Sequence, residues 1–227
     1  MKTTLALLAL LFGVVVAPPA ASAEVEIPTV RWLLDFFAAH ATPLPKCATE
    51  HCTAEEQANR DDVMAVRLEI ARAASGVAYD TSEAPLFRGK YGRAMTALRL
   101  ASIDVHETGL QPKFVRSCHA DRGGEACGVG QVHPGAFGLR LVDGKILLCP
   151  SEGEDCFKGP DLLEDAVLMQ RMMLHILRTG GLGLYTGEGS VEGEASLTIR
   201  EWEAGWYRSH PAPATDIDVL EMIGEDD

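Results

Sequence analysis

The amino-acid sequence predicts a mainly α-helical protein with one main domain, a small β-hairpin and loops held by disulfides. Apolar residues recur at helical spacing through several segments, which is typical of amphipathic helices. The hairpin signal is an Asp-Gly pair between short apolar runs. Six cysteines occur in pairs that are close in the sequence. A chain of 227 residues, 47% of them hydrophobic, can bury one sizeable core.

The first segment, residues 1–23, has the organisation of a secretory signal peptide. Lys2 precedes an apolar run from Leu5 to Val16, and Ala21-Ser22-Ala23 matches a small-x-small cleavage site. We expect the mature chain to begin at Glu24 and to reside in a bacterial periplasm or outside the cell. An uncleaved membrane anchor is the alternative, but the run is shorter than the roughly 20 residues that span a bilayer. We expect no membrane span after cleavage.

The next expected unit is an N-terminal helical segment, residues 24–90, that packs on the core. Residues 24–40 form a short amphipathic helix entered through Pro28, and residues 41–53 form a stapled loop. A capping-box pattern at Thr53-Ala54-Glu55-Glu56 opens a second helix that reaches about Ala74. Residues 75–90, which contain Gly76, are expected to be a connector.

The expected core covers residues 91–210. Its first helix starts near Tyr91 and ends just after Glu107, where Gly109 and Pro112 stop it. The later elements are, in order, a loop at 117–130, a hairpin around Asp143-Gly144 with residues 146–148 as one strand, a turn-rich stretch at 150–160, a helix at 160–178, a glycine-rich loop at 181–193, a helix at 197–208 and an acidic tail at 211–227.

The cysteines favour a disulfide framework. Export and an even count indicate three disulfides, although about fifteen pairings of six cysteines are possible. Their spacing favours three small loops, closed by Cys47–Cys52, Cys118–Cys127 and Cys149–Cys156. Structural zinc is the alternative, because His51-Cys52 and Cys118-His119 are adjacent pairs of ligand type. No C-x-x-C or H-E-x-x-H pattern occurs, so we expect no metal site.

Charge and motif content exclude several classes of protein. The formal net charge is -13, which disfavours nucleic acid as a partner because its phosphates require clusters of Lys and Arg. The G-x-x-x-x-G-K phosphate cradle is absent, and residues 187–190 do not form a nucleophile elbow. We expect no cofactor and a monomeric chain.

One carboxyl group, that of Glu107, follows an unusually apolar helical run. The residues before it are too apolar for a solvated helix, so the run is expected to be buried on most sides. Desolvation there would raise the pKa of Glu107 and let it donate a proton at neutral pH. Cleavage of a glycosidic bond needs such an acid. The alternative is an ordinary acid at a helix end.

Three short motifs around this residue, in order, resemble those of the soluble lytic transglycosylase family. Residues 106–112 (HETGLQP) resemble its E-S-x-F-x-P motif, residues 126–134 (ACGVGQVHP) resemble G-A-x-G-L-M-Q-x-x-P, and residues 184–187 (LYTG) more weakly resemble A-Y-N-x-G. They fall between Tyr91 and Tyr207. Three positions match and three depart: Glu107, Gln131 and Tyr185 match, whereas Thr108, Gly130 and Thr186 replace Ser, Met and Asn.

The resemblance implies a lysozyme-like fold and an exported enzyme that cleaves the MurNAc-GlcNAc bond of peptidoglycan glycan strands. Glu107 would protonate the glycosidic oxygen and then deprotonate the muramyl C6 hydroxyl as a 1,6-anhydro ring closes. Thr108, Gln131 and Tyr185 are the expected substrate-binding residues. Gln131 suits the N-acetyl and hydroxyl groups of a sugar, and Tyr185 would orient Glu107.

Alternatives remain open at this stage. A muramidase would need a second carboxylate, for which Asp104 and Asp121 are candidates. A non-catalytic module that binds the cell wall could share the fold, and Gly130 in place of Met favours it. Individual residues also have structural interpretations: Gln131 as a loop-stabilising amide, Thr108 as a helix-end cap, Trp202, Trp206 and Tyr207 as core rather than sugar-stacking residues, and His106 and His133 as polar structural residues.

Overall fold

The computed structural model describes residues 28–82, 84–121, 124–132, 139–142, 145–148, 159–178 and 193–213. Residues 1–23, which were predicted to be a signal peptide, lie outside these residues, as do Tyr185, Cys149, Cys156 and residues 214–227 of the predicted acidic tail. The described part is mainly helical, with two separate two-stranded sheets. Its elements are α1 (Pro28–His40), α2 (Ala54–Tyr79), α3 (Gly92–Thr108), α4 (Pro112–Val115), β1 (Cys118–Asp121), β2 (Gly124–Cys127), β3 (Leu139–Val142), β4 (Lys145–Leu148), α6 (Asp161–Glu164), α7 (Ala166–Ile176) and α9 (Gly193–Ser209).

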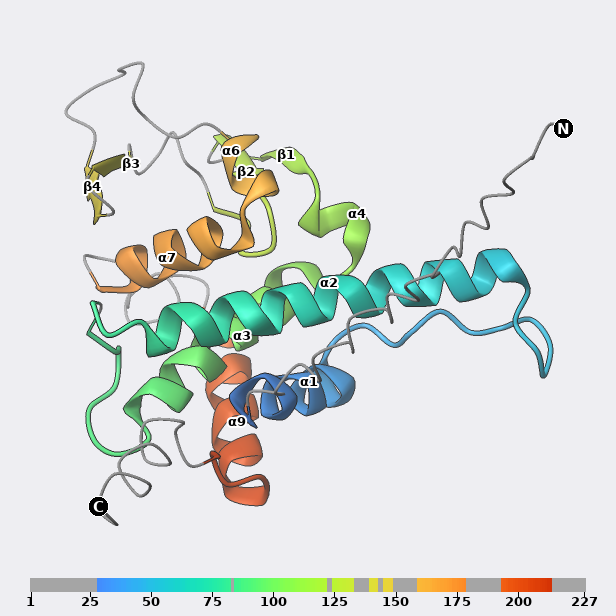
Figure 1. Cartoon of the computed structure of the whole chain (residues 1–227), viewed down its shortest axis with the longest axis horizontal. Coiled ribbons are helices and arrows are strands. Elements are labelled where there is room, and N and C mark those ends of the chain that lie inside the picture. The colour runs from blue at the N-terminus through green and yellow to red at the C-terminus, as the bar shows by residue number, and fades with distance from the viewer. Residues whose placement is uncertain are drawn as a thin grey trace, which may run out of the picture.

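Helix α3 is the centre of the core. Of its 17 residues, 13 are buried, including Leu98, Leu100 and Ile103. Helices α1, α2, α7 and α9 all contact it. Figure 1 shows the long helix α2 crossing the molecule, with α7 on one side and α1 and α9 on the other. The predicted burial of this apolar run is therefore confirmed.

Both ends of α3 agree with the sequence signals. The helix starts at Gly92, one residue after the expected position, and ends at Thr108. Gly109 adopts a left-handed conformation with φ 59°, and its N–H donates to the carbonyl of Val105. A side chain at position 109 would also meet Thr42 Oγ1 at 2.2 Å. Glycine is therefore required here both by backbone conformation and by the close approach of Thr42.

Helix α2 begins as predicted but ends later. Its capping box is formed: Glu56 N–H donates to Thr53 Oγ1 over 3.2 Å, and Thr53 N–H donates to Glu56 Oε2 over 2.8 Å. The predicted end near Ala74 is wrong, because the helix continues through Gly76 to Tyr79. Val77 and Ala78 are buried in the core, and their burial outweighs the cost of about 1 kcal/mol for a glycine inside a helix.

The region predicted as loop at 117–130 contains a hairpin. Strands β1 and β2 pair antiparallel, with Cys118 opposite Cys127. The Cys118–Cys127 disulfide joins the two strands, and a Cys47–Cys52 disulfide closes the loop before α2. Both are among the pairs favoured by cysteine spacing. The prediction of loop was wrong because strand pairing, rather than a run of β-branched residues, defines this hairpin.

The second predicted hairpin is confirmed: β3 and β4 pair antiparallel, and β4 includes residues 146–148.

The single helix predicted at 160–178 is instead two helices, α6 and α7. Asp165 has an extended conformation between α6 and α7, and its side chain accepts a hydrogen bond from Leu168 N–H over 2.9 Å. Asp165 thus caps α7 and interrupts the apolar pattern. Helix α9 begins at Gly193, four residues before the predicted start.

Helix α9 is fixed to α3 by a buried ion pair. Arg99 Nη2 donates to Glu203 Oε2 over 2.8 Å, and Arg99 Nε also bonds the carboxylate. Both residues are nearly inaccessible to solvent. Two parallel hydrogen bonds set the register of α9 along α3.

Among the described helices, none combines the length and apolar character that crossing a bilayer requires.

Candidate functional site

Glu107 lies in the last turn of α3, at the surface of the molecule. Its side chain is 30% exposed. His106 Nδ1 lies 3.7 Å from Glu107 Oε1, and the imidazole is exposed to a similar degree. The carboxyl group is therefore accessible to a ligand. The expectation that Glu107 would be the desolvated acid of this helix is wrong.

The desolvated acid is Asp104, one turn earlier. Asp104 is fully buried, and Gln170 Nε2 on α7 donates to its Oδ2 over 2.7 Å. Burial raises the pKa of Asp104 well above its usual range, the Glu107 carboxylate raises it further, and the hydrogen bond from Gln170 opposes both. Asp104 therefore holds its proton to a higher pH than an exposed aspartate.

Two orphaned oxygen atoms agree with a protonated Asp104. Asp104 Oδ1 and Gln170 Oε1 are both buried, and neither has a hydrogen-bond partner among the residues that the structure describes. Both are acceptors when the acid is ionised, so neither can satisfy the other. A proton on the Asp104 carboxyl group would supply a donor that the ionised pair lacks. Buried polar atoms are rarely left unpaired, so these two oxygen atoms and the raised pKa together favour the protonated form of Asp104.

Thr108 closes the end of α3. Its hydroxyl donates to the carbonyl of Asp104 over 2.9 Å and accepts from Leu110 N–H over 3.3 Å. The side chain is buried. Of the two roles that the sequence allowed, the structure supports the helix-end cap.

Gln131 has a comparable local role in the turn after β2. Its backbone has φ 47°, and its Nε2 donates to the carbonyl of Gly128 over 2.7 Å. Its backbone N–H bonds the same carbonyl over 3.1 Å. The amide thus stabilises a left-handed turn conformation that is unusual for a residue other than glycine.

Methionines of α7 fill the space beside this turn. A Cβ at Gly128 would lie 2.3 Å from Met169 Cε, and a Cβ at Gly130 would lie 2.3 Å from Met173 Sδ. Met169 and Met173 are fully buried. The resembled motif has Met at position 130, whereas this chain has Gly130. Met173 of α7 packs against this glycine.

Three rings form a row that ends beside Glu107. Trp202 of α9 lies between His40 of α1 and His106 of α3, with ring centroids 5.3 and 6.3 Å apart. Trp202 and His40 are half-buried, whereas His106 is exposed. Burial lowers the pKa of His40. Sequence reasoning did not associate His40 with Glu107, because the two residues come from different helices and no local pattern links them.

Trp206, one turn further along α9, belongs to the core. It is 6% exposed, packs edge-on against Phe36 at 5.5 Å and stacks on His210 at 3.6 Å. The core interpretation therefore holds for Trp206, while Trp202 lies at the boundary between core and solvent.

Three site predictions fall outside the described part of the chain. Tyr185 and the Cys149–Cys156 pair lie outside the described residues, as does the side chain of Asp121. Among the described residues, one group has the proximity of metal ligands, namely Cys47, Cys52 and Glu56, and its two sulfur atoms are joined in a disulfide.

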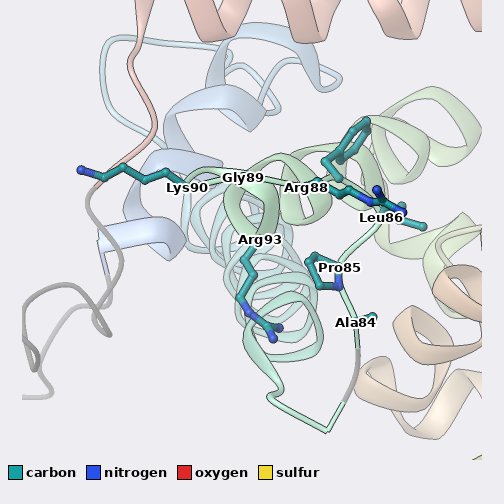
Figure 2. A pocket seen from close by; sticks show the side chains of 8 residues that line it. Ala84, Pro85, Leu86, Arg88, Gly89, Lys90 and Arg93 are labelled. Carbon is teal, nitrogen blue, oxygen red and sulfur yellow. The ribbon is translucent and has the colours of Figure 1, made fainter.

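A separate hollow of about 680 Å³ lies at the loop before α3 and is lined in part by Arg88, Lys90 and Arg93. Figure 2 shows the three cationic side chains leaving in different directions. Arg93 Nη1 also donates to the backbone carbonyls of Ala78 and Asp80, over 2.8 and 3.0 Å. The cations do not converge on one point, so we assign no ligand to this hollow.

Comparisons of the chain with protein-family models, with curated proteins and with solved structures gave no match. Function has to be inferred from the residues of the site.

Proposed function

We propose that this protein is an exported, lysozyme-like lytic transglycosylase that cleaves the β-1,4 bond between MurNAc and GlcNAc of peptidoglycan. The three motifs around Glu107 suggest this chemistry, and the single observation that supports it most is the pairing of Asp104 with Gln170. The carboxyl group one turn before Glu107 is fully buried and has a raised pKa, which leaves Glu107 as the accessible acid of α3. A transglycosylase needs one such group.

The reaction uses that one group twice. In its protonated form, the Glu107 carboxyl group donates its proton to the glycosidic oxygen as the bond from that oxygen to the muramyl C1 breaks. The resulting carboxylate accepts the proton of the muramyl C6 hydroxyl, whose oxygen forms the new bond to C1. The proton count balances, and no water is consumed. His106 Nδ1 lies 3.7 Å from Oε1 of the carboxyl group.

The muramidase alternative needs a second ionised carboxylate, at about 5–5.5 Å for retention or about 6.5–9.5 Å for inversion. Asp104 does not suit that role, because a buried neutral acid neither attacks a sugar nor activates a water molecule. Asp121 remains the candidate for a muramidase.

A non-catalytic wall-binding module is the second candidate. It is favoured by the local hydrogen bonds of Thr108 and Gln131, which engage two of the three expected substrate-binding side chains in their own backbone turns. Such a module would bind glycan strands without cutting them.

Digestion of purified peptidoglycan by the mature protein separates these candidates. Mass spectrometry should detect anhydro-muropeptides, which are lighter by one water molecule than the products of a muramidase. Glu107→Gln should lower the rate at least about 100-fold, the usual effect of losing a general acid. Glu201→Gln, which changes an exposed acid on α9, is the matched control. Cleavage retained by Glu107→Gln would remove Glu107 from the mechanism, and hydrated reducing ends would indicate a muramidase.

A further inference from the structure

The row of rings beside Glu107 brings together residues of three helices, and a buried ion pair joins two of these helices. Glu203, the residue after Trp202, forms the buried ion pair with Arg99. Arg99 and His106 are seven residues apart and so lie on the same face of α3. The ion pair therefore fixes the position of Trp202 beside His106 and, through His106, beside the Glu107 carboxyl group.

Trp202 differs from an ordinary core tryptophan in its surroundings. It is half-buried, and its ring neighbours His40 and His106 are polar. Trp206, on the same helix, instead packs against Phe36 and is nearly inaccessible. The site thus offers a half-buried indole that packs against the core and has two imidazoles as ring neighbours, each of which can form hydrogen bonds.

Pyranose rings fit such a surface. The C–H groups on one face of the sugar are apolar and stack on an indole, while hydroxyl and N-acetyl groups at the ring edge seek hydrogen bonds. Imidazoles at the rim supply those bonds. A ring stacked on Trp202 would lie one histidine away from the carboxyl group that protonates the glycosidic oxygen.

We propose that Trp202, with His40 and His106 as its ring neighbours, is the stacking platform for an N-acetylated pyranose ring of the glycan strand next to the bond that Glu107 cleaves. The inference rests on the proposed function, because it takes the ligand to be a peptidoglycan strand. It adds a binding subsite formed by α1 and α9, outside the three motifs. Trp202 acts by binding the substrate, and Glu107 alone transfers protons.

Binding is measured in the Glu107→Gln variant, so that the ligand is not cut. The probe is a β-1,4-linked oligomer of N-acetylglucosamine, titrated by calorimetry. In this background Trp202→Ala should weaken binding about tenfold, the effect of one lost stacking contact. Trp202→Phe preserves part of the ring and the packing, and it should weaken binding less than Trp202→Ala. Tyr207→Ala removes an aromatic ring from the same helix, where it packs on Tyr91 instead, and should leave affinity unchanged.

The outcomes separate this inference from the proposed function. Loss of binding in Trp202→Ala, with normal binding in Tyr207→Ala, supports the platform. This holds even if peptidoglycan digestion shows no cleavage. In that case the protein is a wall-binding module. Equal affinities in the Trp202 and Tyr207 variants overturn the platform, whether or not the wild-type protein cleaves peptidoglycan. Absence of oligomer binding by the Glu107→Gln protein overturns it as well.

Discussion

The neutral state of Asp104 leads to a prediction about stability and pH. Folding moves Asp104 from water, where its pKa is about 3.9, to a buried site where the pKa is raised. Between those two pKa values the folded protein holds a proton that the unfolded chain has released. Stability contributed by Asp104 is therefore complete below about pH 4 and is lost as pH rises, by about 1.4 kcal/mol per pH unit until the folded pKa is reached.

Asp104→Asn should remove this loss. The amide has nearly the same shape as a protonated carboxylic acid, and its NH₂ group supplies a donor for Gln170 Oε1 while its oxygen accepts from Gln170 Nε2. At about pH 4 the variant should match the wild type to within about 1 kcal/mol. As pH rises, the variant should become relatively more stable by about 1.4 kcal/mol per pH unit.

Urea unfolding monitored by circular dichroism at several pH values between 4 and 8 measures this difference directly. Asp35→Asn, which changes an exposed acid on α1, is the matched control. Asp104→Ala, which leaves the Gln170 amide unpaired and opens a small cavity, should cost about 2–4 kcal/mol at pH 4. A difference between wild type and Asp104→Asn that does not change with pH would refute the assignment of a neutral Asp104.

Three further predictions concern packing and covalent links. Gly130→Ala should destabilise the protein by about 1–3 kcal/mol, because the added Cβ would meet Met173 Sδ at 2.3 Å. Thermal unfolding of the Gly130→Ala/Met173→Ala double variant should show a smaller loss of stability than the sum of the losses in the two single variants. Glu203→Gln should cost about 3–5 kcal/mol by leaving Arg99 buried without its charged partner, and an unfolding free energy close to that of the wild type would contradict this buried ion pair. Replacing Cys118 and Cys127 together by serine should lower the free energy of unfolding by about 2–4 kcal/mol. A smaller decrease is expected if the hairpin already unfolds locally in the native protein. Hydrogen exchange of β1 and β2 measures that local unfolding.

The sequence determined the features that depend on neighbouring residues. The capping box at Thr53 and the left-handed Gly109 act over three or four residues, so their sequence patterns located the start of α2 and the end of α3. Cysteine spacing similarly indicated Cys47–Cys52 and Cys118–Cys127, because short loops bring their ends together at the lowest entropic cost.

Only the tertiary structure decided which acid loses its contact with water. Asp104 and Glu107 lie three residues apart on one helix, and periodicity places both near the same face. Their environments differ because α7 covers Asp104 and supplies Gln170, 66 positions further along the chain, while the end of the helix leaves Glu107 partly exposed. Desolvation depends on which distant side chains cover a group, and helical spacing contains no information about them. The same reason explains why Trp202 and His40 became neighbours of the site only once α1, α3 and α9 had packed together.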